Sequence, residues 1–415
     1  MHGHKTELSH RFVMALLLAV LGLSGCSLSS GGAIGARATG ARLARMKASP
    51  QWNPEQSTFK NTLRRMRSPR SERNRAIFSG GSKHRRPAPE SPIETQSGPD
   101  FSSFPDSGLR ITWMGHSTFL VELDGTRTLV DPIWSERASP FQWLGPQRFY
   151  PPPIPLHTLP TLDAILISHD HYDHLDYHTV LALAEAEVKW IVPLGVGAHL
   201  EHWGIAPDMI FELDWWQHLD VGDVTITATP SRHFSGRAIT LGDQDATLWA
   251  GWAWQGPRHS VFYSGDTALH PEFQTIGERL GPFDVTLMEV GAYSRFWRDV
   301  HLGPEQAVLA HQLVQGDVMI PVHWGLFNMS LHGWTEPVER VLLAAQRVGV
   351  EVAILRPGAS FVGGNPAIVD RWWPNVPWKS PAQSPAWSSQ VEALQAPLRR
   401  PQSRGLNGSP QPNEP

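Results

Sequence analysis

The feature that most constrains this chain is the run HDHYDH at residues 169–174, directly after the apolar run 164–168. Imidazole nitrogens and carboxylate oxygens are ligands for zinc and similar divalent ions. His169 and His171 are two residues apart, so an extended backbone directs both to the same side. Asp173 and His174 follow once the chain turns and can face a second ion. The run predicts a metal site where a strand meets a helix; a chance polar loop is the alternative.

Three further ligand candidates each follow a run with strand character. His233 comes after residues 224–229, Asp266 after 260–263 and His323 after 318–322. Taken singly, they could be a hydrogen-bonded loop histidine, a turn-forming aspartate and a core histidine beside Trp324. Their shared position after successive strands favours one ligand set.

Strand and helix signals are dense between residues 109 and 355. Strand-like runs occupy 109–114, 118–123, 128–130, 163–168, 191–193, 224–229, 247–254, 260–263, 284–290, 318–322 and 352–355, and helical spacing occurs at 175–186, 271–280, 304–314 and 336–348. The dipeptide Asp124-Gly125 predicts a hairpin turn. With 41% hydrophobic residues, the chain can build a large core. The pattern predicts an α/β fold in which helices cover sheets.

The N-terminus has the features of a secretory signal. Lys5 and Arg11 flank the apolar run 12–23, which is short for a permanent membrane span. The sequence Leu-Ser-Gly-Cys ends at Cys26, the single cysteine of the chain, which excludes a disulfide framework. Residues 1–26 resemble a bacterial lipoprotein signal, which implies cleavage before Cys26 and lipidation of that residue. Ser27 suits outer-membrane sorting, so we expect a lipid-anchored envelope protein facing the periplasm. Ordinary secretion or a residual anchor is the alternative.

Charge divides the remaining chain. Residues 27–105 carry 14 Lys/Arg and 5 Asp/Glu and are rich in Ser, Gly and Pro, which predicts a basic flexible linker. Within it, residues 63–75 are predicted either as a short basic helix on lipid head groups or as a solvated tether. Residues 106–415 carry 19 Lys/Arg and 33 Asp/Glu, which argues against nucleic acid as a partner. Residues 365–415, rich in Pro, Ser and Trp, are predicted as a loosely packed tail.

The H-x-H-x-D-H run and the later candidates resemble the metallo-β-lactamase fold over residues 106–364, the predicted catalytic domain. The resemblance implies a four-layer αββα sandwich that binds two divalent ions. Zinc is the first expectation, although iron or manganese would accept these ligands. The resemblance assigns His169, His171 and His233 to the first ion, Asp173, His174 and His323 to the second, and Asp266 to a bridge between them.

Two residues are expected beside this metal site. Asp131, before Pro132, matches an aspartate that members of the fold keep beside the metal-bound water, although a simple turn is an equally good interpretation. His116 follows an early strand that should approach the same edge. Ligating histidines usually donate their second nitrogen to such a partner.

Longer segments resemble N-acylphosphatidylethanolamine-hydrolysing phospholipase D and its bacterial relatives. They are residues 111–121, 130–149, 165–176, 291–293, 304–307 and 323–325. The resemblance implies hydrolysis of a phospholipid to N-acylethanolamine and phosphatidic acid, by a hydroxide shared between the ions. Positions matching His301 and His311 lie at or near the substrate site in that family, so both join Asp131 as catalytic candidates. For His311 the alternative is an ordinary packed or solvated helix residue.

Other functions remain open from the residues. A related branch of the fold contains lactonases acting on sugar phosphates, and a non-catalytic metal-binding surface lipoprotein is a third hypothesis. The 18 tryptophans could line an acyl groove or rest at a membrane interface. For any one of them, such as Trp249, Trp252 or Trp254, a place in the core or on an edge strand is the simpler expectation.

Overall fold

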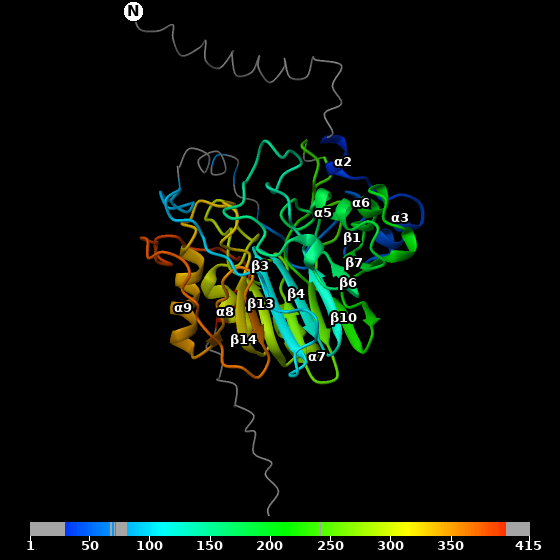
Figure 1. Cartoon of the computed structure of the whole chain (residues 1–415). Coiled ribbons are helices and arrows are strands. Elements are labelled where there is room, and N and C mark those ends of the chain that lie inside the picture. Colours follow the sequence, from blue (N-terminus) through cyan, green and yellow to red (C-terminus); the bar gives the residue numbers. More distant parts are fainter. Residues whose placement is uncertain (1–29, 67–68, 70, 72–80, 241, 396–415) are drawn as a thin grey trace, which may run out of the picture.

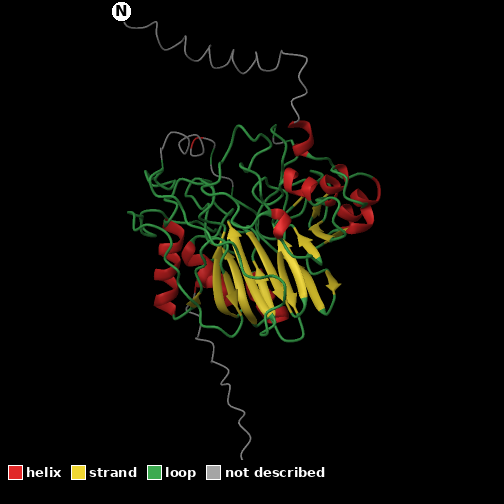
Figure 2. Cartoon of the chain, in the orientation of Figure 1, coloured by secondary structure: helices red, strands yellow, loops and turns green. Residues whose placement is uncertain are grey.

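Two seven-stranded sheets stacked face to face form the centre of the molecule (Figures 1 and 2). The computed structural model describes residues 30–66, 69, 71, 81–240 and 242–395. The predicted signal peptide with Cys26 therefore lies outside the described residues, as does most of the predicted basic helix at 63–75. In the described part of the chain, every helix is too short or too polar to cross a bilayer.

The first sheet combines a meander with a parallel half. In spatial order its strands are β16 (Ser360–Val362), β3 (Leu109–Gly115), β4 (Thr118–Leu123), β5 (Thr126–Val130), β6 (Ala164–Leu166), β7 (Lys189–Pro193) and β8 (Ile210–Leu213). The strands β5 to β8 are parallel. The predicted turn joins β4 to β5: Asp124 and Gly125 have φ of 46° and 88°, the left-handed values that a tight hairpin requires.

The second sheet mirrors this arrangement. Its order is β15 (Glu351–Val352), β14 (Gly316–Val322), β13 (Phe283–Glu289), β12 (Ser260–Tyr263), β11 (Gly251–Gln255), β10 (Val224–Thr229) and β9 (His218–Val221). The strands β12 to β15 are parallel, and β11 is antiparallel to both neighbours. Since β10 and β12 consequently run the same way, the loops after β10, β12, β13 and β14 all leave the same edge of the sheet.

Side chains alternate between two cores. In β4, Phe119 and Val121 face the second sheet, whereas Leu120 belongs to a separate cluster beneath the outer helices. The same alternation separates Leu166 from Ile165 in β6. The simple expectation for Trp249, Trp252 and Trp254 is confirmed, because all three are buried in the core between the sheets.

Helices cover the outer faces. The first sheet is flanked by α5 (Tyr177–Ala182) and α6 (Gly197–His202), whose Val180 and Leu200 join the outer cluster. The helices α7 (Glu272–Leu280), α8 (Pro304–Leu313) and α9 (Glu336–Val348) belong to the other side, where α8 packs on β13 and β14. The predicted αββα sandwich is therefore confirmed.

The stretch predicted as a flexible linker is folded where the structure describes it. The helices α2 (Ser30–Ile34) and α3 (Gly40–Ala48) and a hairpin of β1 (Trp52–Asn53) and β2 (Thr58–Phe59) lie against the catalytic domain. Phe59 is buried in the core, and the Arg42 side chain pairs with the buried Glu212 at 3.1 Å. Composition predicted a linker because the few residues that contact the domain, such as Arg42 and Phe59, are widely spaced among Ser, Gly and Arg.

The predicted loose tail is likewise packed up to residue 395. Trp373 and Val391 are buried, and Ser389 donates its backbone N–H to Asp299 at 2.7 Å. A short helix, η3 (Glu392–Gln395), ends the described part, and two more such turns, η1 (Leu156–Thr158) and η2 (Pro207–Met209), lie in loops. Pro-rich sequence cannot form regular elements, yet isolated Trp and Val residues still anchor it.

Candidate metal centre and substrate pocket

The histidines of the motif converge with His233, as predicted. The loop after β6 carries His169 and His171, whose facing nitrogens, Nε2 and Nδ1, lie 2.7 Å apart. The Nε2 atom of His233, from the loop after β10, lies 3.3 Å from the same Nδ1 atom. These three residues form the first group whose nitrogens could share one ion.

A second group lies beside the first. It contains Asp173, His174 and His323, with His116 as a fourth member. The Nε2 atom of His323 is 3.4 Å from Oδ2 of Asp173, and that of His174 is 3.5 Å from it. The site therefore joins the carboxyl ends of both sheets, because His323 follows β14 and the motif follows β6.

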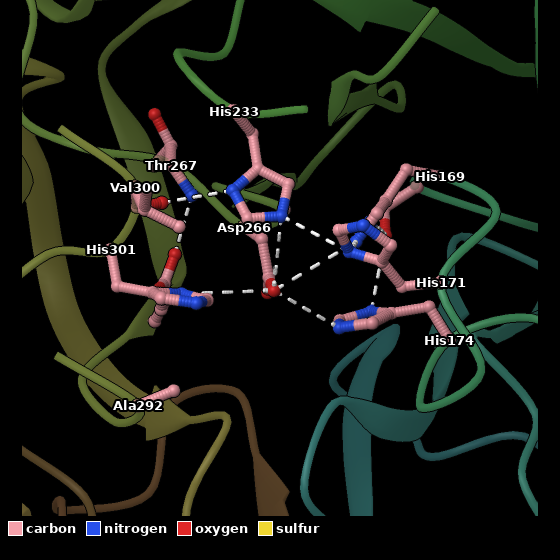
Figure 3. A network of polar contacts seen from close by, with 12 residues as sticks. His169, His171, His174, His233, Asp266, Thr267, Ala292, Val300 and His301 are labelled. Carbon is pink, nitrogen blue, oxygen red and sulfur yellow. Dashed lines mark hydrogen bonds and ion pairs between the residues drawn. The ribbon is translucent and has the colours of Figure 1, made fainter. Parts of the chain in front are cut away.

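Asp266 stands between the two groups (Figure 3). Its Oδ2 atom is 3.1 Å from Nε2 of His323 and 3.3 Å from that of His174. On the other side the same oxygen lies 3.7 Å from His233 Nε2 and 3.9 Å from His169 Nε2. This is the position expected of a carboxylate that bridges two cations.

The donor set fits a metal centre. Within the described residues, Nε2 of His174, Nε2 of His323 and Oδ1 of Asp266 are buried and lack a hydrogen-bond partner. A buried polar atom left unpaired is costly, so such atoms commonly mark an ion or ligand site. Burial opposes ionisation of Asp266, but the nearby His174 and His323 hold its pKa well below the usual range.

A layer of residues behind the ligands fixes their orientation. Asp131 accepts from Nδ1 of His174 at 2.8 Å and from the Ser168 backbone N–H at 2.7 Å. Nδ1 of His233 donates to the Val300 carbonyl at 2.9 Å. The His116 ring lies 2.9 Å from Asp173, on the predicted edge. Asp131 contacts a ligand rather than the pocket, so it is a positioning residue, not the catalytic one that the sequence suggested.

Backbone strain is concentrated here. His116, Asp131 and His323 all have left-handed φ values, of 52°, 41° and 63°. Such conformations persist where the surroundings over-determine them, often at functional sites. Gly291 also permits a close approach, because an added Cβ would lie 2.0 Å from the His323 carbonyl oxygen.

A cavity of about 810 Å³ lies over the candidate metal ligands. His171, Asp173, Asp266 and His323 form part of its floor, and much of its wall is apolar: Met66, Phe234, Ala292, Phe296, Trp297, Val300 and Met329. Such a space accommodates an apolar chain beside a polar reaction centre.

His301 lies in this cavity, where the sequence placed it. Its ring is 5.2 Å from that of His233 and 5.3 Å from that of His323, centroid to centroid. Its Nδ1 atom is held by Glu289 at 2.5 Å, which leaves Nε2 for a bound molecule. Burial lowers the pKa of His301 to about 3.

The family can now be assigned. The profile of the Beta-lactamase superfamily domain matches residues 126–324. An uncharacterised protein of Mycobacterium tuberculosis is 45% identical over 308 residues, covering 73% of this chain and 82% of that protein. N-acyl-phosphatidylethanolamine-hydrolyzing phospholipase D 1 of Caenorhabditis elegans is 39% identical over 251 residues, covering 58% of this chain and 69% of that protein. The chain belongs to the β-lactamase superfamily.

Within this superfamily it is a metal-dependent hydrolase. Solved structures agree on the fold: isothiocyanate hydrolase from Delia radicum gut bacteria aligns with a TM-score of 0.50 at 18% identity, covering 62% of this chain and all of that one.

The structure contradicts the catalytic assignment of His311. Its Nδ1 atom is 2.8 Å from Oγ1 of Thr286, and its ring packs against Gly316. Gly316 begins β14 and His323 follows its end, so roughly 20 Å of strand separates them at about 3.3 Å per residue. His311 belongs to the contact between α8 and the sheet. The sequence placed His311 in a helix, but it could not show that His311 lies on the face of that helix that packs against the sheet.

Sequence reasoning also missed three residues that support the site. Glu289 ends β13, accepts from the Thr267 backbone N–H and holds His301. Asn61 forms two hydrogen bonds with the His233 backbone, at 2.8 and 3.0 Å. Asp170, inside the motif, accepts from Gly236 N–H at 2.8 Å and so fastens the motif to the loop after His233. A lone Glu or Asn carries no spacing signal, whereas Asp170 was visible but had no assigned role.

Proposed function

We propose that this chain hydrolyses the phosphodiester bond of an N-acylphosphatidylethanolamine, releasing N-acylethanolamine and leaving phosphatidic acid. The observation that carries the proposal is the 39% identity to the phospholipase D of Caenorhabditis elegans, which covers 69% of that protein. The apolar cavity supports it, because an acyl chain could lie against Phe234, Phe296 and Trp297 while the phosphate reaches the metal ligands.

Two divalent cations are proposed as cofactors, zinc being the first expectation. When bound, they would activate water as a nucleophile and neutralise charge on the phosphoryl oxygens. The first would be held by His169, His171 and His233, the second by Asp173, His174 and His323, with Asp266 shared.

The remaining steps belong to the chain's own residues. Burial raises the pKa of Glu289 well above its usual range, so its protonated carboxyl can donate to Nδ1 of His301. That bond leaves Nε2–H to donate to a phosphate oxygen or to the leaving-group oxygen. Asp131 and the Val300 carbonyl keep His174 and His233 in the tautomer whose Nε2 faces the centre. The apolar wall excludes water around the acyl chains, which strengthens the polar contacts at the phosphate.

The test is hydrolysis of N-acylphosphatidylethanolamine in mixed micelles, followed by mass spectrometry of both products. The wild-type chain should yield N-acylethanolamine and phosphatidic acid in equal amounts. His169→Ala and Asp266→Asn should each reduce turnover by roughly a thousandfold or more, because each removes a ligand of the reaction centre. Intact lipid in the presence of fully metallated wild-type protein would exclude this substrate, and turnover of soluble lactones instead would favour the lactonase hypothesis.

We also propose that residues 1–26 direct the chain to the bacterial envelope and that Cys26 carries a lipid there. The support is the apolar run 12–23, which is followed by Ser24, Gly25 and the single cysteine of the chain. Mass spectrometry of the mature protein from a bacterial host should find a diacylglyceryl group on an N-terminal Cys26. A Cys26→Ser variant should leave the membrane fraction or keep residues 1–26. An unmodified Cys26 in the mature protein would contradict the anchor.

A further inference from the structure

Exposed apolar side chains gather around the mouth of the cavity. Met66 lines the cavity and is 48% exposed. Trp143 and Leu144, 67% and 55% exposed, lie on a loop whose two ends, Ala138 and Pro146, line the cavity. Ile239, 62% exposed, lies on a loop between the lining residues Gly236 and Asp243. Three separate segments thus place large apolar groups in water at one opening, where an exposed patch usually marks an interaction site.

The loop that carries Trp143 is held in place by its own hydrogen bonds. The Arg137 guanidinium donates to the carbonyl oxygens of Gln142 and Gly145, at 3.2 and 2.7 Å. The Ala138 N–H donates to Pro146 O at 3.0 Å, which closes the loop. Trp143 pairs with the Phe141 ring at 5.4 Å between centroids. The loop therefore presents its aromatic tip in a fixed position.

The loop that carries Ile239 is built in a similar way. The Asp243 carboxylate accepts from the backbone N–H groups of Arg237 and Ala238, both at 2.8 Å. The Oδ1 atom of Asp243 is buried, whereas the Ile239 side chain is exposed. Figure 2 shows most of the loops at the upper end of the two sheets, with several short helices beside them.

Arginine side chains lie at the same opening, where Arg65 also pairs with Asp245 at 3.4 Å. Arg65 and Arg298 line the cavity, and the exposed Arg295 lies on the loop that carries Phe296 and Trp297. Arg64, the neighbour of Arg65, is exposed as well. The catalytic body is otherwise acidic, with 33 Asp/Glu against 19 Lys/Arg over residues 106–415. Apolar tips beside basic groups match the chemistry of an anionic lipid surface.

We propose that this rim, formed by Met66, Trp143, Leu144 and Ile239 with the neighbouring arginines, docks on an anionic bilayer so that lipid enters the cavity directly. The inference rests on the proposed function, since it supplies the route by which a phospholipid reaches the metal centre. Trp143 and Leu144 enter the interface, where tryptophan is favoured, and the arginines contact lipid phosphates.

The first test uses the chain's single cysteine. In a Cys26→Ser background, which also removes any lipid on that residue, Trp143→Cys is labelled with an environment-sensitive fluorophore. Vesicles containing phosphatidylglycerol should shift its emission to the blue, and neutral vesicles should do so less. The control is Val348→Cys at the end of α9, before β15 begins and therefore at the opposite end of the sheets; its emission should not change.

Three results would overturn the docking proposal. The first is no change in the emission of the label at residue 143, and the second is an equal change at residue 348. The third is a change in emission that occurs without vesicles and depends on protein concentration, which would assign the rim to a second copy of the chain.

A second test separates docking from chemistry. Trp143→Ser combined with Leu144→Ser should lower hydrolysis of N-acylphosphatidylethanolamine in anionic vesicles by about tenfold or more. Hydrolysis of a water-soluble phosphodiester should be unchanged, because neither residue lines the cavity over the metal ligands. If the labelled chain docks but cleaves neither substrate, the proposed function fails while docking stands. Equal activity of the variant on vesicles would overturn the docking proposal.

Discussion

At the scale of single residues, the site depends on which nitrogen of each histidine is free. His174 and His233 are held through Nδ1 by Asp131 and by the Val300 carbonyl, so their Nε2 atoms meet at Asp266. His301 is also held through Nδ1, by the Glu289 carboxyl. These partners matter to the metal site as much as the candidate ligands do. An imidazole ring that rotated would no longer direct its lone pair at the metal position.

His311 provides a prediction about pH. Burial lowers its pKa to about 4, from 6.5 in an exposed histidine. The unfolded chain therefore binds this proton at a higher pH than the folded chain, so stability falls as the pH drops from about 6.5 to 4 and is unaffected above that range. The full effect is on the order of 3 kcal/mol. In His311→Gln, urea unfolding should show a flatter fall of the unfolding free energy across this range.

The same variant tests the role of His311. Since His311 contacts Thr286 and Gly316 and lies outside the cavity lining, His311→Gln should keep its metal content and its kcat at pH 7.5. A folded variant that lost either would return His311 to the catalytic centre.

At the scale of elements, each ligand stands just beyond a strand end. Strand β6 leads to the motif, and β10, β12 and β14 lead to His233, Asp266 and His323. The position of each of these candidate ligands could be predicted, because apolar runs followed by His or Asp are visible locally. Glu289 could not, since one glutamate at the end of a strand carries no pattern. The packing of residues 30–66 was missed because it depends on isolated contacts with residues more than a hundred positions away.

The N-terminal segment gives a prediction at this scale. Asn61 bonds both backbone groups of His233, so Asn61→Ala should loosen that ligand and reduce metal affinity by roughly tenfold. Competition with a chelator measures the change. Asn53→Ala is the matched control, because Asn53 only supports the exposed turn after β1; its metal affinity should equal that of the wild type. Equal affinity in both variants would show that the segment does not support the site.

At the scale of the whole molecule, the site belongs to neither sheet alone. The motif comes from the first sheet, and His233, Asp266 and His323 come from the second, so the sandwich must close before the ligands meet. The segments that precede and follow the catalytic domain strengthen this closure. Arg232, beside His233, donates to the carbonyl oxygens of Arg64 and Ser389, which lie in the N-terminal and C-terminal segments. Metal binding and folding should therefore be linked, as ligands that meet only in the folded state make binding energy stabilise the fold.

The most direct measurement is the metal content of the full chain purified without chelators, by elemental mass spectrometry. We predict two divalent ions per chain in the wild type and clearly less in His169→Ala and Asp266→Asn. His311→Gln should match the wild type. A metal-free chain that hydrolyses its substrate at full rate, or ligand variants that retain both ions, would contradict the metal centre and the mechanism built on it.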